Sequence, residues 1–503
     1  MRAPSPVHTV ASVDLGAESG RVVRVDFDGE RLDTREISRF THTPVPVDGI
    51  LRWDLDHLAR AITDGLSALG GDGTPVASVG VDAWGVDYGL LGTDGVLVDL
   101  PTCYRDPRQL AAMDEALATV GRERLYRSTG VQVNEINTVF ALMSDARTTT
   151  RLDDTAALLM MPDVFHHLLS GARVTEFTAA STTGLYDVAG RRWVTELADD
   201  LGIPAGVLPE VVPSGTDVGP VVGPLGDGPL AGTRVIAPAG HDTASAVVAT
   251  PFPDPGALFI SSGTWSLVGV EVPRPVVTAA SLAANLTNEG GYDGTTRLLR
   301  NVMGLWILQE CRRAWAGRGL ELSYARLTEL AVGEPALRSF VNPNARDFLG
   351  RGEMPARVQA YCRRSGQPVP ESPAAITRCV VDSLALSYRT SAEDIAAVTG
   401  TAPSAVCVTG GGARNELLAQ ATADATGLPV LCGPVEATSL GNAATQLVAL
   451  GELGGIADIR ALIAGTTDLR TWLPRPDTRW EQAAARLREM TQDDDRQRGL
   501  IPT

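Results

Sequence analysis

The sequence predicts an α/β protein with two domains, and three observations support this prediction. The chain has 503 residues, more than one ordinary hydrophobic core accommodates. Each half opens with a strand, a glycine turn and a second strand and then continues into helices, which indicates a duplicated α/β architecture. A stretch rich in proline and small residues separates the halves near 245–256. We therefore predict domains at 1–248 and 249–503, with a frayed, solvated tail from about 492.

The elements of the first half follow from the spacing of apolar residues. In order, we expect strands at 8–14, 21–27 and 34–39, a helix at 55–69, a strand at 76–82, mainly helices over 110–170 and a strand at 235–239. The last strand leads into a glycine turn at Gly240 and a helix that starts near Asp242.

The second half repeats this order of elements. Apolar runs predict strands at 257–261, 265–271 and 406–409, and helical spacing predicts helices near 302–314, 373–397 and 413–426. The strand at 406–409 meets three consecutive glycines, 410–412, before the last of these helices.

Composition and charge exclude several classes of protein. Apolar residues make up 44% of the chain and charged residues 20%, which is ordinary for a globular protein. The net charge of −17 argues against a broad nucleic-acid surface, although backbone amides and single arginines can still bind an anionic nucleotide. No apolar run approaches the ~18 residues of a spanning helix, so we expect no membrane partner.

All 43 basic residues are arginine, so the chain contains no lysine. This absence excludes the P-loop lysine, the protein-kinase lysine and Schiff-base chemistry. The sequence also lacks the His-Glu-x-x-His motif of zinc enzymes and the Gly-x-Ser-x-Gly motif of serine hydrolases.

The six cysteines form no Cys-x-x-Cys pair, and the first strand follows no secretory signal pattern. These features indicate a reduced, cytoplasmic protein. Cys362 and Cys379 flank a short loop and could pair, but two independent buried thiols are the favoured interpretation.

Asp14 comes directly before a glycine turn that contains Ser19, Gly20 and Arg21. Backbone amides in such a turn form a concave anion site, and glycine lets the chain approach a phosphate closely. Asp14 would then face a phosphate-bound Mg²⁺, mostly through water. A plain β-hairpin explains the same segment, so both interpretations stay open.

Two candidate nucleotide contacts lie in the second half. Thr264 follows Gly263 in a turn whose hydroxyl and amides could contact a γ-phosphate, although an ordinary hairpin turn has the same composition. The glycines at 410–412 remove side chains where a flat ring or a ribose could lie against the backbone. Their spacing differs from the dinucleotide-binding Gly-x-Gly-x-x-Gly fingerprint.

Asp242, in Gly240-His241-Asp242-Thr243, is the candidate general base. A carboxylate at such a turn can accept a proton from a sugar hydroxyl as its bond to phosphorus forms, a contribution of ~10²–10⁴-fold. Helix N-capping is the alternative role, both for Asp242 and for Asn301, which precedes a predicted helix. Together with the turn after Asp14, the segment indicates phosphoryl transfer from ATP to a small polyol or sugar.

These segments together resemble the FGGY carbohydrate kinases, within the actin-like and sugar-kinase ATPase superfamily. The similarity runs in consistent order from about residue 8 to 475. Its segments include 13–17, 80–87, 104–106, 161–163, 240–246, 261–267, 285–291, 342–344, 433–437 and 440–442.

The resemblance implies a fold of two actin-like (ribonuclease H-like) domains, each a mixed sheet flanked by helices, around a catalytic cleft. It implies phosphorylation of the ketose L-rhamnulose at its 1-hydroxyl, with ATP and Mg²⁺, in L-rhamnose catabolism. Asp242 corresponds to the proton acceptor and Asp14 to the aspartate on the metal side. The implied substrate contacts are Gly85, His241, Asp242, Thr243 and Asn301. The implied nucleotide contacts are Ala17, Glu18, Ser19, Gly20, Arg21, Thr264, Gln309 and Gly411.

Glu18 departs from the family's pattern, because relatives often carry a small serine at this position. An acid beside phosphate is repulsive, so we predict that the Glu18 side chain turns outward. Another family kinase, acting on xylulose, ribulose or fuculose, is the nearest alternative. An actin-like ATPase used for binding or assembly is a further one, against which Asp242 counts. The expected partners are a small ketose and ATP, without nucleic acid, and a monomer is the default.

Overall fold

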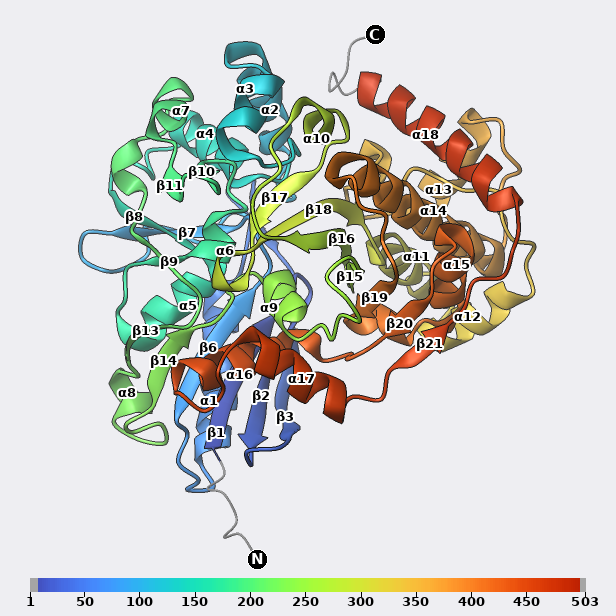
Figure 1. Cartoon of the computed structure of the whole chain (residues 1–503). Coiled ribbons are helices and arrows are strands. Elements are labelled where there is room, and N and C mark those ends of the chain that lie inside the picture. Colours follow the sequence, from blue (N-terminus) through green and yellow to red (C-terminus); the bar gives the residue numbers. More distant parts are fainter. Residues whose placement is uncertain (1–7, 498–503) are drawn as a thin grey trace, which may run out of the picture. The chain divides into compact units, whose positions relative to one another are not determined.

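The structure, a computed structural model, describes residues 8–497 and divides into two compact units (Figure 1). The first unit contains the chain up to Pro251 together with Glu271–Leu298 and Glu436–Thr467. The second unit contains Phe252–Val270, Leu299–Val435 and the chain from Asp468 onward. The chain therefore passes between the units several times, which a linear pattern of elements does not reveal. No helix within residues 8–497 is long and apolar enough to cross a membrane.

A six-stranded mixed sheet forms the centre of the first unit, in the order β13-β14-β6-β1-β2-β3. Its strands are β1 (His8–Leu15), β2 (Ser19–Phe27), β3 (Leu32–Thr41), β6 (Ser78–Ala83), β13 (Thr216–Pro220) and β14 (Arg234–Ala237). Strand β1 runs antiparallel to β2 and parallel to β6, so Asp14 lies opposite Arg21 on one side and Asp82 on the other. The register thus gathers the polar residues at the ends of three strands.

Short strands and helices surround this sheet. Two-stranded sheets pair β4 (Val45–Val47) with β5 (Ile50–Arg52), β7 (Tyr88–Gly92) with β8 (Thr155–Met160), β9 (Thr175–Glu176) with β12 (Val211–Val212), and β10 (Tyr186–Asp187) with β11 (Arg192–Trp193). The helices before residue 251 are α1 (Leu55–Gly70), α2 (Arg108–Thr119), α3 (Arg122–Thr129), α4 (Thr138–Thr148), α5 (Met161–Ser170), α6 (Phe177–Ala180), α7 (Thr195–Asp200), η1 (Ala205–Val207), α8 (Gly223–Gly226) and α9 (Asp242–Val248). The later segments add α10 (Ala279–Ala283), β17 (Thr287–Gly290), η2 (Tyr292–Gly294), α16 (Ala437–Ala449) and α17 (Ile456–Thr466).

The interpretation of 110–170 as mainly helical is confirmed except at β8, which pairs antiparallel with β7. A short, buried apolar run has no period of its own that separates a strand from a helix, and here its pairing partner decides.

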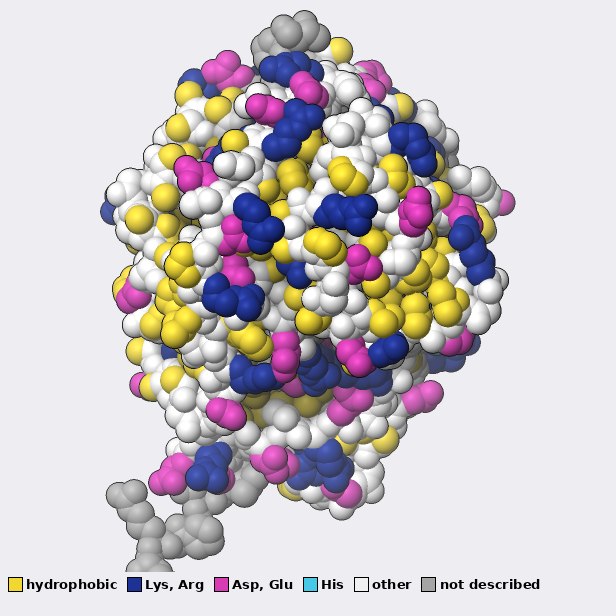
Figure 2. All heavy atoms as spheres, turned by 90° about the vertical axis from the view of Figure 1, so that its right-hand side faces the viewer, with side chains coloured by type: hydrophobic (Ala, Val, Ile, Leu, Met, Phe, Trp, Pro, Cys, Tyr) yellow, Lys and Arg dark blue, Asp and Glu magenta, His cyan; other side chains and the backbone are white. Residues whose placement is uncertain are grey.

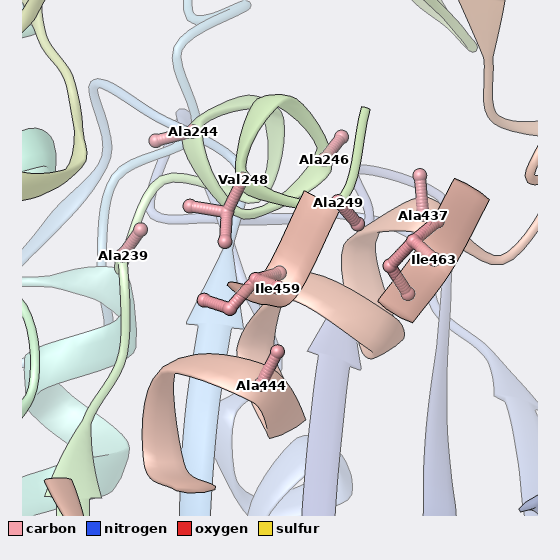
Figure 3. Close-up of a cluster of buried hydrophobic side chains, with 9 residues drawn as sticks. All are labelled: Ala239, Ala244, Ala246, Val248, Ala249, Ala437, Ala444, Ile459 and Ile463. Carbon is pink, nitrogen blue, oxygen red and sulfur yellow. The ribbon is translucent and has the colours of Figure 1, made fainter. Parts of the chain in front are cut away.

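Helix α16 belongs to the core of the first unit although it comes late in the chain. It packs on β1, β6 and α9. Figure 3 shows this core, in which alanines of α9 and α16 lie beside the larger side chains of Val248 and of Ile459 and Ile463 from α17. Small side chains let the helices approach closely, which the alanine-rich sequence of α9 and α16 provides.

The other large sheet has seven strands in the order β17-β18-β16-β15-β19-β20-β21. Its remaining strands are β15 (Leu258–Ser262), β16 (Trp265–Val272), β18 (Thr296–Met303), β19 (Val406–Thr409), β20 (Val430–Cys432) and β21 (Arg470–Trp472). The helices of the second unit are α11 (Trp306–Ala316), α12 (Tyr324–Val332), η3 (Arg346–Phe348), α13 (Met354–Arg364), α14 (Pro373–Thr399), η4 (Gly411–Arg414), α15 (Glu416–Thr426) and α18 (Arg479–Gln497). The long helix α14 packs against α12, α15 and α18 (Figure 1).

Two predicted helix starts in the second unit are corrected. The helix expected at 302–314 begins only at Trp306, because 302 and 303 still belong to β18. Asn301 therefore lies inside a strand, and its interpretation as a helix N-cap is wrong. The helix expected from 413 begins at Glu416, where the Asn415 side chain accepts a hydrogen bond from the Leu418 amide and caps it.

The frayed tail expected from about 492 is also corrected over the described residues. Helix α18 continues to Gln497, and Asp494 is buried within it. Its carboxylate accepts hydrogen bonds from Asn342 Nδ2 and Tyr361 Oη, each at 2.8 Å. Residues 498–503 lie outside the described part of the chain.

All six cysteines are buried free thiols, as the favoured interpretation predicted. Cys362 Sγ and Cys379 Sγ lie 4.0 Å apart.

Candidate active site

The turn between β14 and α9 is held in place by the short helix α6. Gly240 N donates to Glu176 Oε2 at 2.9 Å, and His241 N donates to Thr178 Oγ1 at 3.0 Å. Glu176 is fully buried, and the same carboxylate oxygen accepts the first amides of α6. The Gly240 carbonyl in turn accepts from Ala83 N at the end of β6. Side chains from a different part of the chain therefore fix the backbone that carries Asp242.

Asp242 is the first residue of α9, whereas His241 occupies the N-cap position. Asp242 Oδ1 accepts a hydrogen bond from Thr243 Oγ1 at 3.1 Å and one from Thr243 N. The side chain is 28% exposed. Burial and the Asp14 carboxylate raise the pKa of Asp242, while His241 acts in the opposite direction. The N-cap interpretation of Asp242 is thus wrong, and its carboxylate keeps access to solvent and to a substrate.

His241 faces a buried ion pair on one side and Gly85 on the other. Its Nδ1 lies 3.2 Å from Arg297 Nη2 and 3.3 Å from Glu289 Oε2. Its Nε2 lies 3.4 Å from Asp242 Oδ1. A Cβ at position 85 would lie 3.2 Å from Nε2, a tighter contact than usual, so a side chain there would press on the His241 ring. The structure thus brings together three of the predicted substrate contacts, Gly85, His241 and Asp242.

The ion pair beside His241 is among the most buried in the described chain. Arg297 is completely buried and Glu289 is 4% exposed. Arg297 Nη2 lies 3.2 Å from Glu289 Oε2, and Arg297 Nε donates to the Gly290 carbonyl at 2.8 Å. Burial lowers the pKa of the Arg297 guanidinium, and Glu289 opposes this change. A buried charge without such a partner would be strongly destabilising, so the two residues depend on each other.

Asp14 and Asp82 form an acidic pair at the ends of β1 and β6. Asp14 Oδ2 accepts from Arg21 Nε at 2.9 Å, and Arg21 also pairs with Glu436. Asp82 is fully buried and accepts from Asn442 Nδ2 at 2.6 Å. Burial and the Asp14 carboxylate raise the pKa of Asp82.

These two carboxylates supply the oxygen ligands that Mg²⁺ prefers. Asp82 Oδ1 is buried and has no hydrogen-bond partner within residues 8–497. Over the same residues, no group of three or more His, Cys, Asp or Glu side chains could hold a metal ion. The arrangement therefore fits an ion that keeps most of its ligands from phosphate and water rather than one in a closed protein cage.

The turn between β1 and β2, which the sequence predicts as a phosphate contact, includes Ala17, Glu18, Ser19 and Gly20. Gly16 N donates to Ser19 O at 3.0 Å, which closes the turn. Residues 16–19 are all partly exposed, so this turn lies at the surface of the unit. His42 fixes the turn from behind, because its backbone N donates to Glu18 O and its Nε2 lies 2.8 Å from Gly16 O. The outward orientation of the Glu18 side chain stays a prediction.

Trp84, next to Gly85, belongs to a buried aromatic cluster rather than to an exposed sugar platform. The Nε1 atoms of Trp53 and Trp84 donate to Asp87 Oδ2 at 2.6 and 2.8 Å. His42 stacks on Trp84 with ring centroids 5.3 Å apart. Burial raises the pKa of Asp87 to about 7. Through His42, the cluster connects the β1–β2 turn to the segment that carries Gly85.

In the second unit, Thr264 and Gln309 lie on adjoining elements. The carbonyls of Gly263 and Thr264 accept hydrogen bonds from backbone amides 304–306, at the start of α11. Gln309 lies one turn into that helix, and its Oε1 is buried without a hydrogen-bond partner in the described chain. A carboxamide in this state fits a ligand that donates a hydrogen bond, as an adenine amino group or a ribose hydroxyl does.

The three glycines at 410–412 serve different purposes beside the same β15–β16 turn. Gly410 has φ +78°, a conformation that favours glycine. A Cβ at Gly412 would lie 1.9 Å from Ser262 Oγ, so this glycine is required for packing. A Cβ at Gly411 would meet nothing within 4 Å, so this position faces open space. Gly411 is therefore the glycine of the three that a ligand can approach.

The sequence-predicted residues thus fall into two groups, one in each unit. The first unit holds Asp14, the 17–21 turn, Gly85 and 241–243, and the second holds Thr264, Asn301, Gln309 and Gly411. The sequence did not reveal Glu176, Thr178 and Arg297 as supports of the site. The signal was weak: a charged residue within the apolar strand around Arg297, and a lone glutamate before the small residues of α6.

Comparison with known proteins places these features in a family. Residues 9–249 match the FGGY family of carbohydrate kinases, N-terminal domain, and residues 258–450 match its C-terminal domain. The chain is 40% identical to a rhamnulokinase of Bacteroides thetaiotaomicron over 475 residues, 94% of this chain and 97% of the relative. It is also 40% identical to a rhamnulokinase of Pectobacterium carotovorum, covering 99% of both chains.

A solved structure shows the same fold at lower identity. The ligand-bound xylulose kinase from Lactobacillus acidophilus aligns with a TM-score of 0.76 and 16% identity, over 98% of both chains. The expected two-domain α/β fold is confirmed. The chain belongs to the FGGY family of carbohydrate kinases.

Proposed function

We propose that this kinase transfers the γ-phosphoryl group of ATP to the 1-hydroxyl of L-rhamnulose. The products are ADP and L-rhamnulose 1-phosphate. The observation that carries the proposal is the 40% identity to rhamnulokinases over 94–99% of the chain, which includes the segment with His241 and Asp242. Other FGGY kinases act on related ketoses, and these are the alternative substrates.

In this proposal, Asp242 accepts the proton of the 1-hydroxyl while the oxygen attacks the γ-phosphorus. Its partial exposure and its hydrogen bonds from Thr243 leave the second carboxylate oxygen for the substrate. A raised pKa makes the carboxylate a better proton acceptor, provided that it is ionised at the working pH. His241 and Gly85 bound the sugar side of this carboxylate.

The proposed nucleotide contacts lie in and beside turns of both units. Residues 17–19 are partly exposed at the surface of the first unit, and Arg21 adds a positive charge. In the second unit, Thr264, Gln309 and the open face at Gly411 are the proposed contacts. Mg²⁺, held on the protein side by Asp14 with Asp82 behind it, would neutralise phosphate charge.

The test is ADP release with Mg·ATP across L-rhamnulose, L-fuculose, D-xylulose, L-ribulose and glycerol. We expect L-rhamnulose to give the highest kcat/KM. Asp242→Asn is expected to lower kcat by ~10²–10⁴-fold, because the amide cannot accept the proton. Asp33→Asn, at an exposed carboxylate of β3, is the matched control and should retain activity.

The outcomes separate substrate from mechanism. If another ketose gives the highest kcat/KM, the proposed general base would stand and L-rhamnulose would be replaced as the proposed substrate. ADP release that needs no sugar and survives Asp242→Asn would contradict the kinase mechanism itself.

A further inference from the structure

The contact between Arg297 and His241 determines which ring nitrogen of His241 carries a proton. A guanidinium has five N–H donors and no acceptor. Arg297 Nη2 makes its hydrogen bond to His241 Nδ1 at 3.2 Å. Nδ1 must then be the acceptor, and the proton of the neutral ring lies on Nε2.

Glu289 offers a hydrogen-bond acceptor, rather than a donor, to the same nitrogen. Its Oε2 lies 3.3 Å from His241 Nδ1 and 3.2 Å from Arg297 Nη2. A carboxylate only accepts, so a ring governed by Glu289 would carry its proton on Nδ1 instead. The contact with hydrogen-bond geometry is the one from Arg297, whereas Glu289 meets His241 as a charge contact. Glu289 therefore neutralises the charge of Arg297, and Arg297 determines which nitrogen of the His241 ring is protonated.

The protonated Nε2 points to the place where the proposed chemistry occurs. Nε2 lies 3.4 Å from Asp242 Oδ1 and faces Gly85, which has no side chain to cover it. A donor at this position can hold the oxygen of a sugar hydroxyl while Asp242 accepts the proton of that hydroxyl. With the proton on Nδ1, the same side would present a lone pair and would compete with Asp242.

We propose that Arg297 and Glu289 are positioning residues that hold His241 as an Nε2–H donor toward the sugar. This inference rests on the proposed role of Asp242. Arg297 and Glu289 act through His241.

Other hydrogen bonds hold the backbone around His241, Arg297 and Glu289. Ser181 Oγ accepts from Gly290 N at 2.7 Å, and Thr178 Oγ1 accepts from His241 N. Both supports belong to α6 or its end, so the strand with Glu289 and the turn with His241 are anchored to one element. A variant that changes only the ion pair leaves these anchors in place.

The variants are chosen so that no buried charge loses its partner. Glu289→Met with Arg297→Met removes both charges together with the donor to Nδ1, and methionine offers no N–H in its place. Arg297→Lys keeps a positively charged, donor-only group and is the conservative variant that should rescue the tautomer. Arg234→Met with Asp217→Asn removes an exposed ion pair of the same unit and is the matched control.

The measurement is nitrogen-15 NMR of the histidine rings in protein labelled only at histidine. The chain has six histidines, and His241→Gln assigns the signal of interest. We expect an unprotonated Nδ1 and a protonated Nε2 in the wild type and in Arg297→Lys. The double variant is expected to lose this single tautomer.

Steady-state kinetics provide the second readout. We expect the double variant to raise KM for the sugar roughly tenfold while KM for ATP stays within about twofold, since the change is confined to the sugar side. A wild-type His241 that carries its proton on Nδ1 would overturn the proposal, and so would an unchanged tautomer in a folded double variant. Absence of any ketose phosphorylation with the expected tautomer would instead refute the proposed function.

Discussion

Two turns with candidate residues, one in each unit, are built in opposite ways. In the first unit, buried charged side chains hold the turn before α9: Glu176 binds its backbone, and Arg297 with Glu289 faces His241. In the second unit, the β15–β16 turn is held by backbone carbonyls and amides and by close packing against Gly412.

The difference matches what each turn is proposed to do. A general base needs a controlled charge, which only fixed polar side chains provide. A phosphate or ribose contact needs accessible backbone, which close packing of small residues leaves open. The net charge of the chain does not distinguish a general-base turn from a turn that contacts phosphate or ribose. The reason is that arginine and acidic side chains are interspersed over the face shown in Figure 2.

The largest expected effect is a pH dependence of stability that comes from Asp87 in the first unit. The pKa of Asp87 rises from its ordinary 3.8 to about 7 in the folded protein, chiefly because of burial. Between these values the folded state binds more protons than the unfolded state, so this stabilising contribution is complete below 3.8. It is lost as the pH rises through about 7. Because a tenfold change in proton affinity is worth 1.36 kcal/mol, the loss reaches about 4 kcal/mol.

Asp87→Asn removes this titration while its amide oxygen can still accept from both tryptophans. Urea unfolding at pH 5, 6, 7 and 8 should show the variant gaining stability relative to the wild type as the pH rises. A constant difference between the two proteins at all four values would exclude Asp87 as the titrating group.

A somewhat smaller loss is expected from Glu176→Met. Glu176 Oε2 accepts from Thr178 N and Oγ1, Ala179 N and Gly240 N, and Oε1 accepts from Ser214 Oγ. A thioether accepts hydrogen bonds only weakly, so these buried donors lose their partner, at a cost of about 2–3 kcal/mol. Thermal unfolding measures this loss. The kcat should also fall, because Gly240, next to His241, loses its anchor; full activity would mean that Glu176 does not position the turn.

In the second unit, packing rather than charge should dominate. Gly412→Ala places a methyl group against Ser262 and should cost about 1–3 kcal/mol, as overpacking of a dense interior does. This loss should be independent of pH between 5 and 8. An increase in stability would show that Ser262 has room to rotate away.

The smallest effect on stability is expected one residue earlier. Gly411→Ala adds a methyl group to open space and should change stability by less than about 0.5 kcal/mol. If the nucleotide approaches this face, KM for ATP should rise roughly tenfold and KM for the sugar should not change. The pair of variants separates a packing glycine from a binding glycine, and an unchanged KM for ATP would remove Gly411 from the nucleotide site.

The sequence by itself determined the elements that depend on local pattern. The strands β1, β2, β6, β15 and β19 and the helices α1 and α14 were predicted close to their observed bounds, because apolar spacing and turn residues act within a few positions. Candidate sites such as Asp242 were predicted for the same reason: a strand, a glycine turn and a helix start are adjacent in the chain.

The tertiary structure alone decided the contacts that span long separations. Asn442 meets Asp82 across 360 positions, and Arg297 meets His241 across 56. It also decided that β8 is a strand and that α18 extends through a buried Asp494. Local patterns carry no information about such partners, because the free energy of burying a charge depends on what the rest of the fold places beside it.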